Sequence, residues 1–152
     1  QSQANEKSLK MLARMDNEDN AVSLHVRRGD YLQAKHWNAI GHICQLPYYQ
    51  NALSKLKELV AEPVFYVFSD DIDWVKDNLP LENAIFVDWN KGQDSWQDMM
   101  LMSHCRHHII CNSTFSWWGA WLDPRKDKIV IAPQYTVSDE VVPSSWIQVP
   151  IK

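Results

Sequence analysis

Short apolar runs alternate along the chain with stretches of helical periodicity, and this alternation constrains the fold more than any other feature. The runs span residues 21–27, 64–71, 84–89, 107–113 and 128–133. The connections between them are too long for hairpins, and most contain a helical pattern. Parallel strands need such crossovers, which are nearly always right-handed. The sequence therefore predicts an α/β fold with a mostly parallel sheet and helices on both faces.

The chain has the size and charge of one globular domain. Its 152 residues are enough to bury most of its apolar surface around a single core. No apolar stretch approaches the roughly 20 residues that cross a bilayer. The net charge of −4 argues against a general nucleic-acid binder, which needs a basic field to displace counterions from phosphates. Any anion site must therefore be local.

The cysteines and the start of the chain bear on its cellular context. Cys44, Cys105 and Cys111 are odd in number and contain no Cys-x-x-Cys pair. We expect reduced thiols in a cytoplasmic protein, with peripheral membrane association left open for the intact protein. The start has neither an initiating Met nor a signal-peptide pattern, so the chain is expected to be an excised fragment.

Three of the apolar runs end in polar residues. These tips are HVRRGD (residues 25–30), FSDD (68–71) and CNSTFS (111–116). In open parallel sheets, ligands bind beyond the carboxyl ends of the strands. The three tips are therefore the first candidates for a binding site.

Two adjacent arginines mark the first tip. His25 and Arg27 fall on one face of the expected strand, whereas Arg28 falls on the other face or starts the loop. A guanidinium binds phosphate oxygens in a bidentate way and stays charged at any relevant pH, which suits a diphosphate. An ion pair of Arg27 or Arg28 with Asp30, which would only fix the loop, is an equally weighted alternative.

The third tip lies where a strand gives way to a helix. Free backbone N–H groups and the helix dipole favour phosphate at such a place, and hydroxyls add donors. An ordinary N-cap is the alternative interpretation. The polar residues concerned are Asn112, Ser113, Thr114 and Ser116.

The second tip carries Ser69, Asp70 and Asp71. A carboxylate at a strand end suits hydrogen bonds to a base or a ribose, as in dinucleotide-binding folds. The alternative is that Asp70 or Asp71 caps the helix that follows.

Other nucleotide and metal motifs are missing from the sequence. The chain has four glycines and neither a Gly-x-Gly-x-x-Gly motif nor a Walker loop, which argues against nicotinamide cofactors and ATP-type phosphate cradles. The stretch CRHHIIC contains possible zinc ligands, but His107 and His108 point in opposite directions on a strand. We therefore expect no cofactor and no metal.

The three tips together closely resemble the motifs of the α-1,2-fucosyltransferases, inverting enzymes that use GDP-fucose. The His-x-Arg-Arg-x-Asp motif of that family is matched by residues 25–30, and a second motif is matched by FSDD. The third motif, Asn-Ser-Thr-Phe-Ser-Trp-Trp, is matched by residues 112–118 without a change. The motifs follow the order of the family and span most of the chain.

The resemblance implies one half of a GT-B enzyme, in which two Rossmann-like domains flank a cleft. Residues 1–152 are expected to form the single C-terminal domain that binds GDP-fucose, without the N-terminal acceptor domain. The implied partners are GDP-fucose, a galactose-terminated glycan and that N-terminal domain, with no nucleic acid. Enzymes of the family generally need no divalent metal.

The resemblance also assigns roles to individual residues. Arg27 would clamp the β-phosphate and stabilise the negative charge that develops on the leaving diphosphate. The loop around the phosphate would be shaped by His25, Arg28 and Asp30. Guanine or ribose would contact Asp70, together with Ser69 and Asp71. The diphosphate and the fucose would meet Ser113, Thr114 and Phe115, flanked by Asn112 and Ser116.

The implied reaction is transfer of L-fucose to the 2-hydroxyl of a galactoside with inversion. Two alternatives stay open. The isolated chain could be a GDP-sugar-binding module without activity, since one half of a cleft cannot position both substrates. Alternatively, the enzyme could transfer fucose to a different acceptor, such as a peptide.

Overall fold

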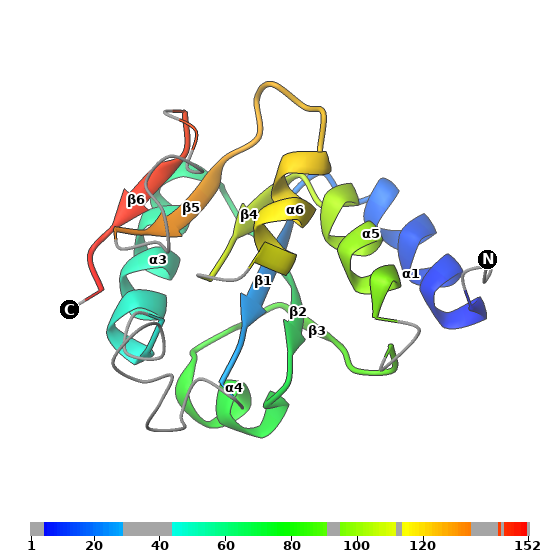
Figure 1. The fold of residues 1–152 in the computed structure, drawn as a ribbon, viewed down its shortest axis with the longest axis horizontal. Helices are drawn as coiled ribbons and strands as arrows, with labels where there is room; N and C mark the ends of the chain where they lie inside the picture. The colour runs from blue at the N-terminus through cyan, green and yellow to red at the C-terminus, as the bar shows by residue number, and fades with distance from the viewer. Residues whose placement is uncertain are drawn as a thin grey trace.

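A six-stranded parallel sheet forms the centre of the molecule (Figure 1). The computed structural model describes residues 5–28, 44–90, 95–111, 114–134, 143 and 145–151, with the side chain of Thr114 excepted. The strand order is β3-β2-β1-β4-β5-β6, and every neighbouring pair is parallel. The strands are β1 (Ala21–Val26), β2 (Val64–Ser69), β3 (Ala84–Val87), β4 (His107–Ile109), β5 (Val130–Pro133) and β6 (Ile147–Val149). Dinucleotide-binding sheets have this same order, so the expected α/β, Rossmann-like fold is confirmed.

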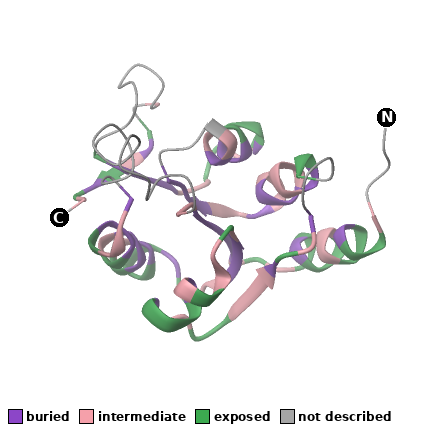
Figure 2. Ribbon diagram, turned by 60° about the horizontal axis from the view of Figure 1, so that its bottom comes forward, coloured by how far each residue is buried: buried purple, intermediate pink, exposed green. Residues whose placement is uncertain are grey.

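Helices cover both faces of the sheet. The described residues form α1 (Glu6–Asp16), α3 (Leu46–Leu59), α4 (Ile72–Asn78), α5 (Trp96–His104) and α6 (Thr114–Leu122). Helices α3 and α4 pack on one face, whereas α1, α5 and α6 pack on the other. Figure 2 shows the buried residues concentrated on the strands and on the inward sides of the helices. No helix in these described ranges is long and apolar enough to cross a membrane.

Local signals in the sequence explain where the first helices begin. The side chain of Asn5 caps α1 by accepting the N–H of Ser8 at 2.9 Å. Pro47 occupies the first turn of α3, where a missing N–H costs nothing. Both signals lie within the first turn or next to it, so these two starts depend on residues close in sequence.

Polar side chains occupy interior positions on α1 and α5 that hydropathy does not indicate. Ser8 and Gln97 are fully buried, whereas Leu9 on α1 is 53% exposed. The Oε1 atom of Gln97 accepts the backbone N–H of Asn5 at 2.9 Å, which joins the starts of the two helices. A buried polar group is tolerated when its hydrogen bonds are satisfied, so partners decide these positions rather than hydrophobicity.

The sequence did not predict strand β6. It has three residues and lies between Pro143 and Pro150. It pairs in parallel with β5, with Ile147 opposite Ile131. Three residues are too few for a readable two-residue period, so only the pairing with β5 defines this edge strand.

Candidate functional site

An open pocket of about 740 Å³ lies at the carboxyl edge of the sheet. It is bounded by the ends of β1, β2 and β3 and by the first turns of α4, α5 and α6. Its size is in the range of pockets that bind small molecules and cofactors. Ligands of open parallel sheets bind at this edge, which makes the pocket the candidate site.

The structure brings most of the described candidate residues to this pocket. Six of them line it: His25, Arg27, Ser69, Asp70, Asp71 and Phe115. Two more do not line the pocket: Arg28 contacts Gln45, and Ser116 contacts Cys111. Asp30, Asn112 and Ser113 lie outside the described residues, as does the side chain of Thr114. The positions of these four side chains therefore stay predictions.

Arg27 and Asp70 connect the tips of the neighbouring strands β1 and β2. The Nε atom of Arg27 lies 3.5 Å from Oδ2 of Asp70, and both side chains are about one-third exposed, at 38% and 35%. The backbone N–H of Arg28 donates to Oδ1 of Asp70 at 2.8 Å. Both oxygens of Asp70 therefore help to hold the first tip, including Arg27, at the pocket.

Arg28 packs against α4 and the start of α3. Its guanidinium carbon lies 4.0 Å from the centroid of the Trp74 ring, a cation–π arrangement. Its Nη1 donates to Oε1 of Gln45 at 3.1 Å, and its Nε lies 3.8 Å from Oδ2 of Asp71. The side chain is only 12% exposed. Adjacent arginines thus have different surroundings: Arg27 lines the pocket, whereas Arg28 joins secondary-structure elements.

Ser69 and Asp71 shape the turn between β2 and α4. The Ser69 hydroxyl accepts the N–H of Asp71 at 2.9 Å. Oδ1 of Asp71 accepts the N–H of Trp74 at 3.1 Å, so Asp71 is the N-cap of α4. The capping interpretation of this tip is therefore confirmed for Asp71.

His25 is a buried, neutral residue in the pocket wall. Its Nδ1 lies 3.4 Å from Sγ of Cys111, and its ring centroid lies 5.9 Å from that of Phe115. Burial and the positive charge of Arg27 lower the pKa of His25 to about 4, although Asp70 opposes the shift. His25 therefore carries no charge near neutral pH.

The start of α6 is tied to the end of β4 by Ser116. Its hydroxyl oxygen accepts the N–H of Cys111 at 3.3 Å, and the hydroxyl also donates to the Cys111 carbonyl at 3.4 Å. Ser116 is fully buried, and its hydrogen bonds join the first turn of α6 to Cys111, which follows β4. This connection sets the position of Phe115 in the pocket wall.

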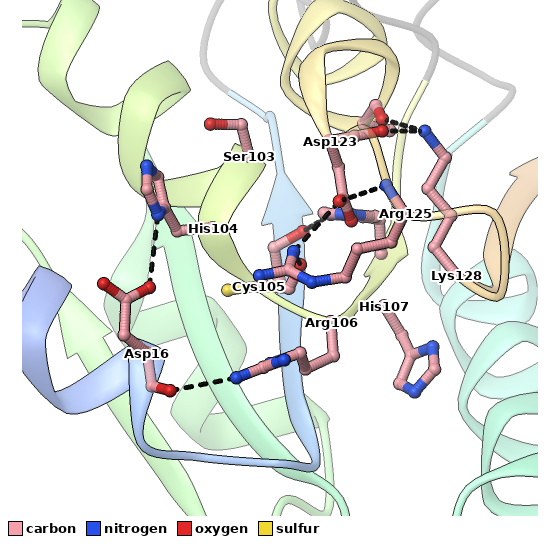
Figure 3. Close-up of polar contacts among 12 residues, drawn as sticks. Asp16, Ser103, His104, Cys105, Arg106, His107, Asp123, Arg125 and Lys128 are labelled. Atoms are coloured by element: carbon pink, nitrogen blue, oxygen red, sulfur yellow. Dashed lines mark hydrogen bonds and ion pairs between the residues drawn. The ribbon is translucent and has the colours of Figure 1, made fainter.

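A buried polar cluster anchors the other end of α6. His108 on β4 contacts Asp123 through Nε2 and Oδ2 at 2.8 Å, and its Nδ1 lies 2.8 Å from the Ser23 hydroxyl. Figure 3 shows Asp123 between Arg125 and Lys128; Nη1 of Arg125 donates to Oδ1 of Asp123 at 2.9 Å. Lys128 donates to the carbonyl oxygens of Asp123 and Ala120 at the helix end. The cluster joins β1, β4 and the end of α6.

The charge states of this cluster follow from its burial. Burial lowers the pKa of His108, although Asp123 opposes the shift. Burial also disfavours ionisation of Asp123, but hydrogen bonds from His108 and Arg125 bring its pKa below the usual value. His108 is therefore neutral beside an ionised Asp123. Ser23, His108 and Asp123 have the order of a hydrolytic triad, but exposures of 3%, 0% and 1% leave no access for a substrate.

Five polar residues of the pocket were not identified from the sequence: Asp73, Asp88, Asn90, Ser95 and Asp98. Asp88 and Asn90 directly follow β3, so the rule applied to the other strand ends would have found them. Asp98 belongs to the first turn of α5, and only the packing of α5 brings it to the pocket.

Asp98 is a half-buried carboxyl whose pKa is raised. Its Oδ1 accepts Nδ2 of Asn90 at 2.9 Å, and its Oδ2 has no partner among the described residues. Burial raises the pKa of Asp98 to about 6, although the hydrogen bond from Asn90 opposes the shift. Asn90 is held by Ser8 at 3.0 Å and by Asn5 at 2.8 Å. A network of hydrogen bonds thus orients one carboxyl oxygen of Asp98.

The described part of the pocket wall shows no arrangement for a metal. Within the part of the chain that the structure describes, no group of three His, Cys, Asp or Glu residues is placed to hold a metal ion. The side chains of Cys44, Cys105 and Cys111 are buried and form no disulfide. The groups that face the pocket are therefore one guanidinium, several carboxyls and a neutral imidazole.

Comparison with known proteins finds similarity over most of the chain. A family model described as "Glycosyl transferase family 11" matches residues 2–146. The O-antigen biosynthesis glycosyltransferase WbnK of Escherichia coli is 40% identical over 116 residues, which cover 76% of this chain and 38% of that protein. An alpha-1,2-colitosyltransferase of Escherichia coli is 40% identical over 141 residues, or 86% of this chain and 48% of that protein.

A human protein is also similar. The human galactoside alpha-(1,2)-fucosyltransferase 1 is 33% identical over 103 residues, which cover 66% of this chain and 28% of that protein. The chain therefore spans less than half the length of each of these three relatives.

Proposed function

The chain belongs to glycosyl transferase family 11, and on this basis we propose that its pocket binds GDP-fucose for inverting transfer of L-fucose to the 2-hydroxyl of a galactoside. The observation that carries the proposal is the distribution of charge in the pocket. Arg27 supplies a cation at the end of β1, beside Asp70, whereas Asp88 and Asp98 supply further carboxyls by β3 and α5. A nucleoside diphosphate has the complementary distribution, with anionic oxygens at one end and N–H and O–H donors at the other.

Arg27 is the proposed phosphate-binding group. As the sugar departs with oxocarbenium character, negative charge grows on the diphosphate oxygen. A fixed guanidinium stabilises that charge more strongly in the transition state than in the ground state, which accelerates the step. The ion pair with Asp70 holds Arg27 in place without covering it, since 38% of its side chain stays exposed. We assign no general base for the acceptor to the described pocket residues. The acceptor site is expected in the part of the longer relatives that the chain does not cover.

Two other functions are supported by specific observations. Transfer of colitose is favoured by the 40% identity over 141 residues to the colitosyltransferase. A GDP-sugar-binding module without activity by itself agrees with the small share of the relatives that the chain covers. An acceptor screen of the intact enzyme with nucleotide-activated fucose and colitose separates these possibilities, because only a transferase forms a glycoside product.

We expect GDP and GDP-fucose to bind the chain with a preference over ADP and UDP. Titration monitored by backbone amide chemical shifts should perturb residues 25–28, 69–71 and 115, which surround the pocket. The amide of Lys55 on α3, on the opposite face of the sheet from Phe115, serves as an internal control. Absence of shifts with every nucleotide would contradict the proposed donor site.

The affinity for GDP-fucose is expected to rise with pH through the pKa of Asp98. We propose that the free carboxylate oxygen of Asp98 accepts an N–H or O–H of the nucleoside, so the proton must leave first. With a pKa of about 6, ionisation changes about tenfold between pH 5 and pH 7, and the affinity should follow. GDP-fucose is the appropriate ligand, since its sugar-linked diphosphate lacks the terminal phosphate that titrates near pH 6.

Asp98→Asn is the matched variant for this pH profile. It should bind more weakly at pH 7 and lose the pH dependence, which calorimetry at several pH values measures. The folded state holds the Asp98 proton more tightly than the unfolded state does, so this residue's contribution to stability is lost as pH rises through about 6. The variant should therefore be more stable than wild type at pH 7. Unchanged affinity with an unchanged pH profile would contradict the role of Asp98.

A further inference from the structure

The thiol of Cys111 faces the ring of His25 behind the pocket wall. Sγ lies 3.4 Å from Nδ1, and the two residues are 1% and 7% exposed. Burial raises the pKa of Cys111 to about 11, although hydrogen bonds to Ser116 and to the backbone of Arg27 oppose the shift. Cys111 is therefore an S–H group at neutral pH, and it is too buried and too weakly acidic to act as a nucleophile.

Both groups are neutral, so one hydrogen atom lies between Sγ of Cys111 and Nδ1 of His25. Either the thiol donates to Nδ1, or Nδ1–H donates to sulfur. A thiol is a weak donor and its sulfur a weak acceptor, whereas the unprotonated nitrogen of a neutral imidazole is a good acceptor. Sulfur already accepts from the backbone of Arg27. Donation from the thiol to Nδ1 is therefore the favoured arrangement.

Ser116 does not offer the thiol a better partner. Its Oγ lies 3.7 Å from Sγ of Cys111, farther than Nδ1 of His25. The Ser116 oxygen also accepts the N–H of Cys111, while its hydrogen donates to the Cys111 carbonyl. The imidazole remains the closer and less occupied acceptor for the thiol hydrogen.

We propose that the Cys111 thiol fixes His25 in the tautomer with hydrogen on Nε2, so that His25 presents a neutral N–H donor to oxygen atoms of the bound ligand. The hydrogen bond at one ring nitrogen decides which nitrogen carries the proton. Nδ1 is engaged by the thiol, and Nε2 has no partner among the described residues. His25 is then a ligand-binding residue and Cys111 a positioning residue.

A neutral donor suits the surroundings of His25. Arg27 is two residues away, and its positive charge disfavours a second cation on the imidazole. The neutral ring can still donate one hydrogen bond to an anionic or hydroxyl oxygen without repelling the guanidinium. The identity of that oxygen rests on the proposed function, with the diphosphate or ribose of a nucleotide sugar as the ligand class.

The tautomer can be measured without any ligand. In the full chain labelled with ¹⁵N, multiple-bond proton–nitrogen correlation spectra distinguish an imidazole protonated at Nε2 from one protonated at Nδ1. We expect His25 to show hydrogen on Nε2 in the ligand-free protein. Hydrogen on Nδ1 would overturn the proposal.

Variants of Cys111 test the positioning role. Cys111→Ala removes the donor and should increase the fraction of His25 protonated at Nδ1, whereas Cys111→Ser keeps a donor and should restore the wild-type signal. Cys105→Ala is the control, because it removes another buried thiol, one that contacts Leu101. An unchanged tautomer in Cys111→Ala would overturn the role of the thiol. If that variant does not fold, loss of the Nε2-protonated form in Cys111→Ser overturns it.

Amide variants of His25 test the ligand contact. The side-chain amide of His25→Gln lies near the position of Nε2, whereas that of His25→Asn lies near Nδ1. We expect His25→Gln to keep most of the GDP affinity and His25→Asn to lose about tenfold, the size of one hydrogen bond to a charged group. Equal affinities would contradict the Nε2 donor. A wild-type protein that binds no nucleotide would contradict the proposed hydrogen bond from Nε2 to the ligand. If the Nε2-protonated tautomer is still observed in that case, the role of the Cys111 thiol is supported independently.

Discussion

Arg27→Ala is expected to weaken the binding of GDP by about 1.5–3 kcal/mol, or roughly tenfold to more than a hundredfold. The substitution removes the guanidinium at the end of β1 that lines the pocket. A charge-assisted hydrogen bond to phosphate is among the strongest single polar contacts, because donor and acceptor are both ionised. Isothermal titration calorimetry of the full chain measures the loss directly.

Two further variants make the result specific. Arg27→Lys keeps the charge but loses the planar fork, so it should retain only part of the affinity. Arg14→Ala removes the same charge from an exposed position on α1 and should bind as wild type does. The stability of Arg27→Ala should change little, since its ion pair with Asp70 is partly exposed and such pairs contribute about 0–1 kcal/mol. Wild-type affinity in Arg27→Ala would refute the phosphate clamp.

Asp123→Ala is expected to lower the free energy of unfolding by about 1–3 kcal/mol. The carboxylate of Asp123 is the shared acceptor for His108 and Arg125, and its side chain is fully buried. Its removal leaves Nε2 of the buried His108 without this partner. The Arg125 side chain is 27% exposed and keeps its hydrogen bond to the Cys105 carbonyl. Urea denaturation followed by circular dichroism measures the change.

Controls within the same segment separate this effect from a general loss of charge. Asp127 is exposed four residues away, and Asp127→Ala should change the stability by no more than about 0.5 kcal/mol. Asp123→Asn keeps an acceptor for His108 but not the charge that pairs with Arg125, so its stability should lie between those of wild type and Asp123→Ala. A loss below 1 kcal/mol in Asp123→Ala would show that the cluster does not anchor α6.

The position of the site could be predicted because strand ends are readable in this chain. Each of the runs before Arg27, Asp70 and Asn112 is apolar and then abruptly polar. In a parallel sheet such transitions lie on one edge, and the structure places the first two beside the same pocket. The expected cap at Asp71 could be predicted for the same reason, since capping depends on residues close in sequence.

The remaining site residues depend on contacts between distant segments. Asp98 reaches the pocket because α5 packs against α1, and Asn90 holds it through a network that includes Ser8 and Asn5. Gln97 is buried for a related reason, as its partner lies 92 positions away. Neither hydrophobic periodicity nor a local motif contains that information.

The sequence by itself therefore determined the α/β class, the polar edge of the sheet and the candidate residues on it, because period, caps and strand ends are properties of neighbouring residues. The tertiary structure alone decided which partners these residues have: Arg27 with Asp70, Arg28 with Trp74, and His25 with Cys111. Those partners determine exposure, charge and the position of hydrogen atoms. The chemistry of the pocket thus follows from contacts between residues that are far apart in the chain.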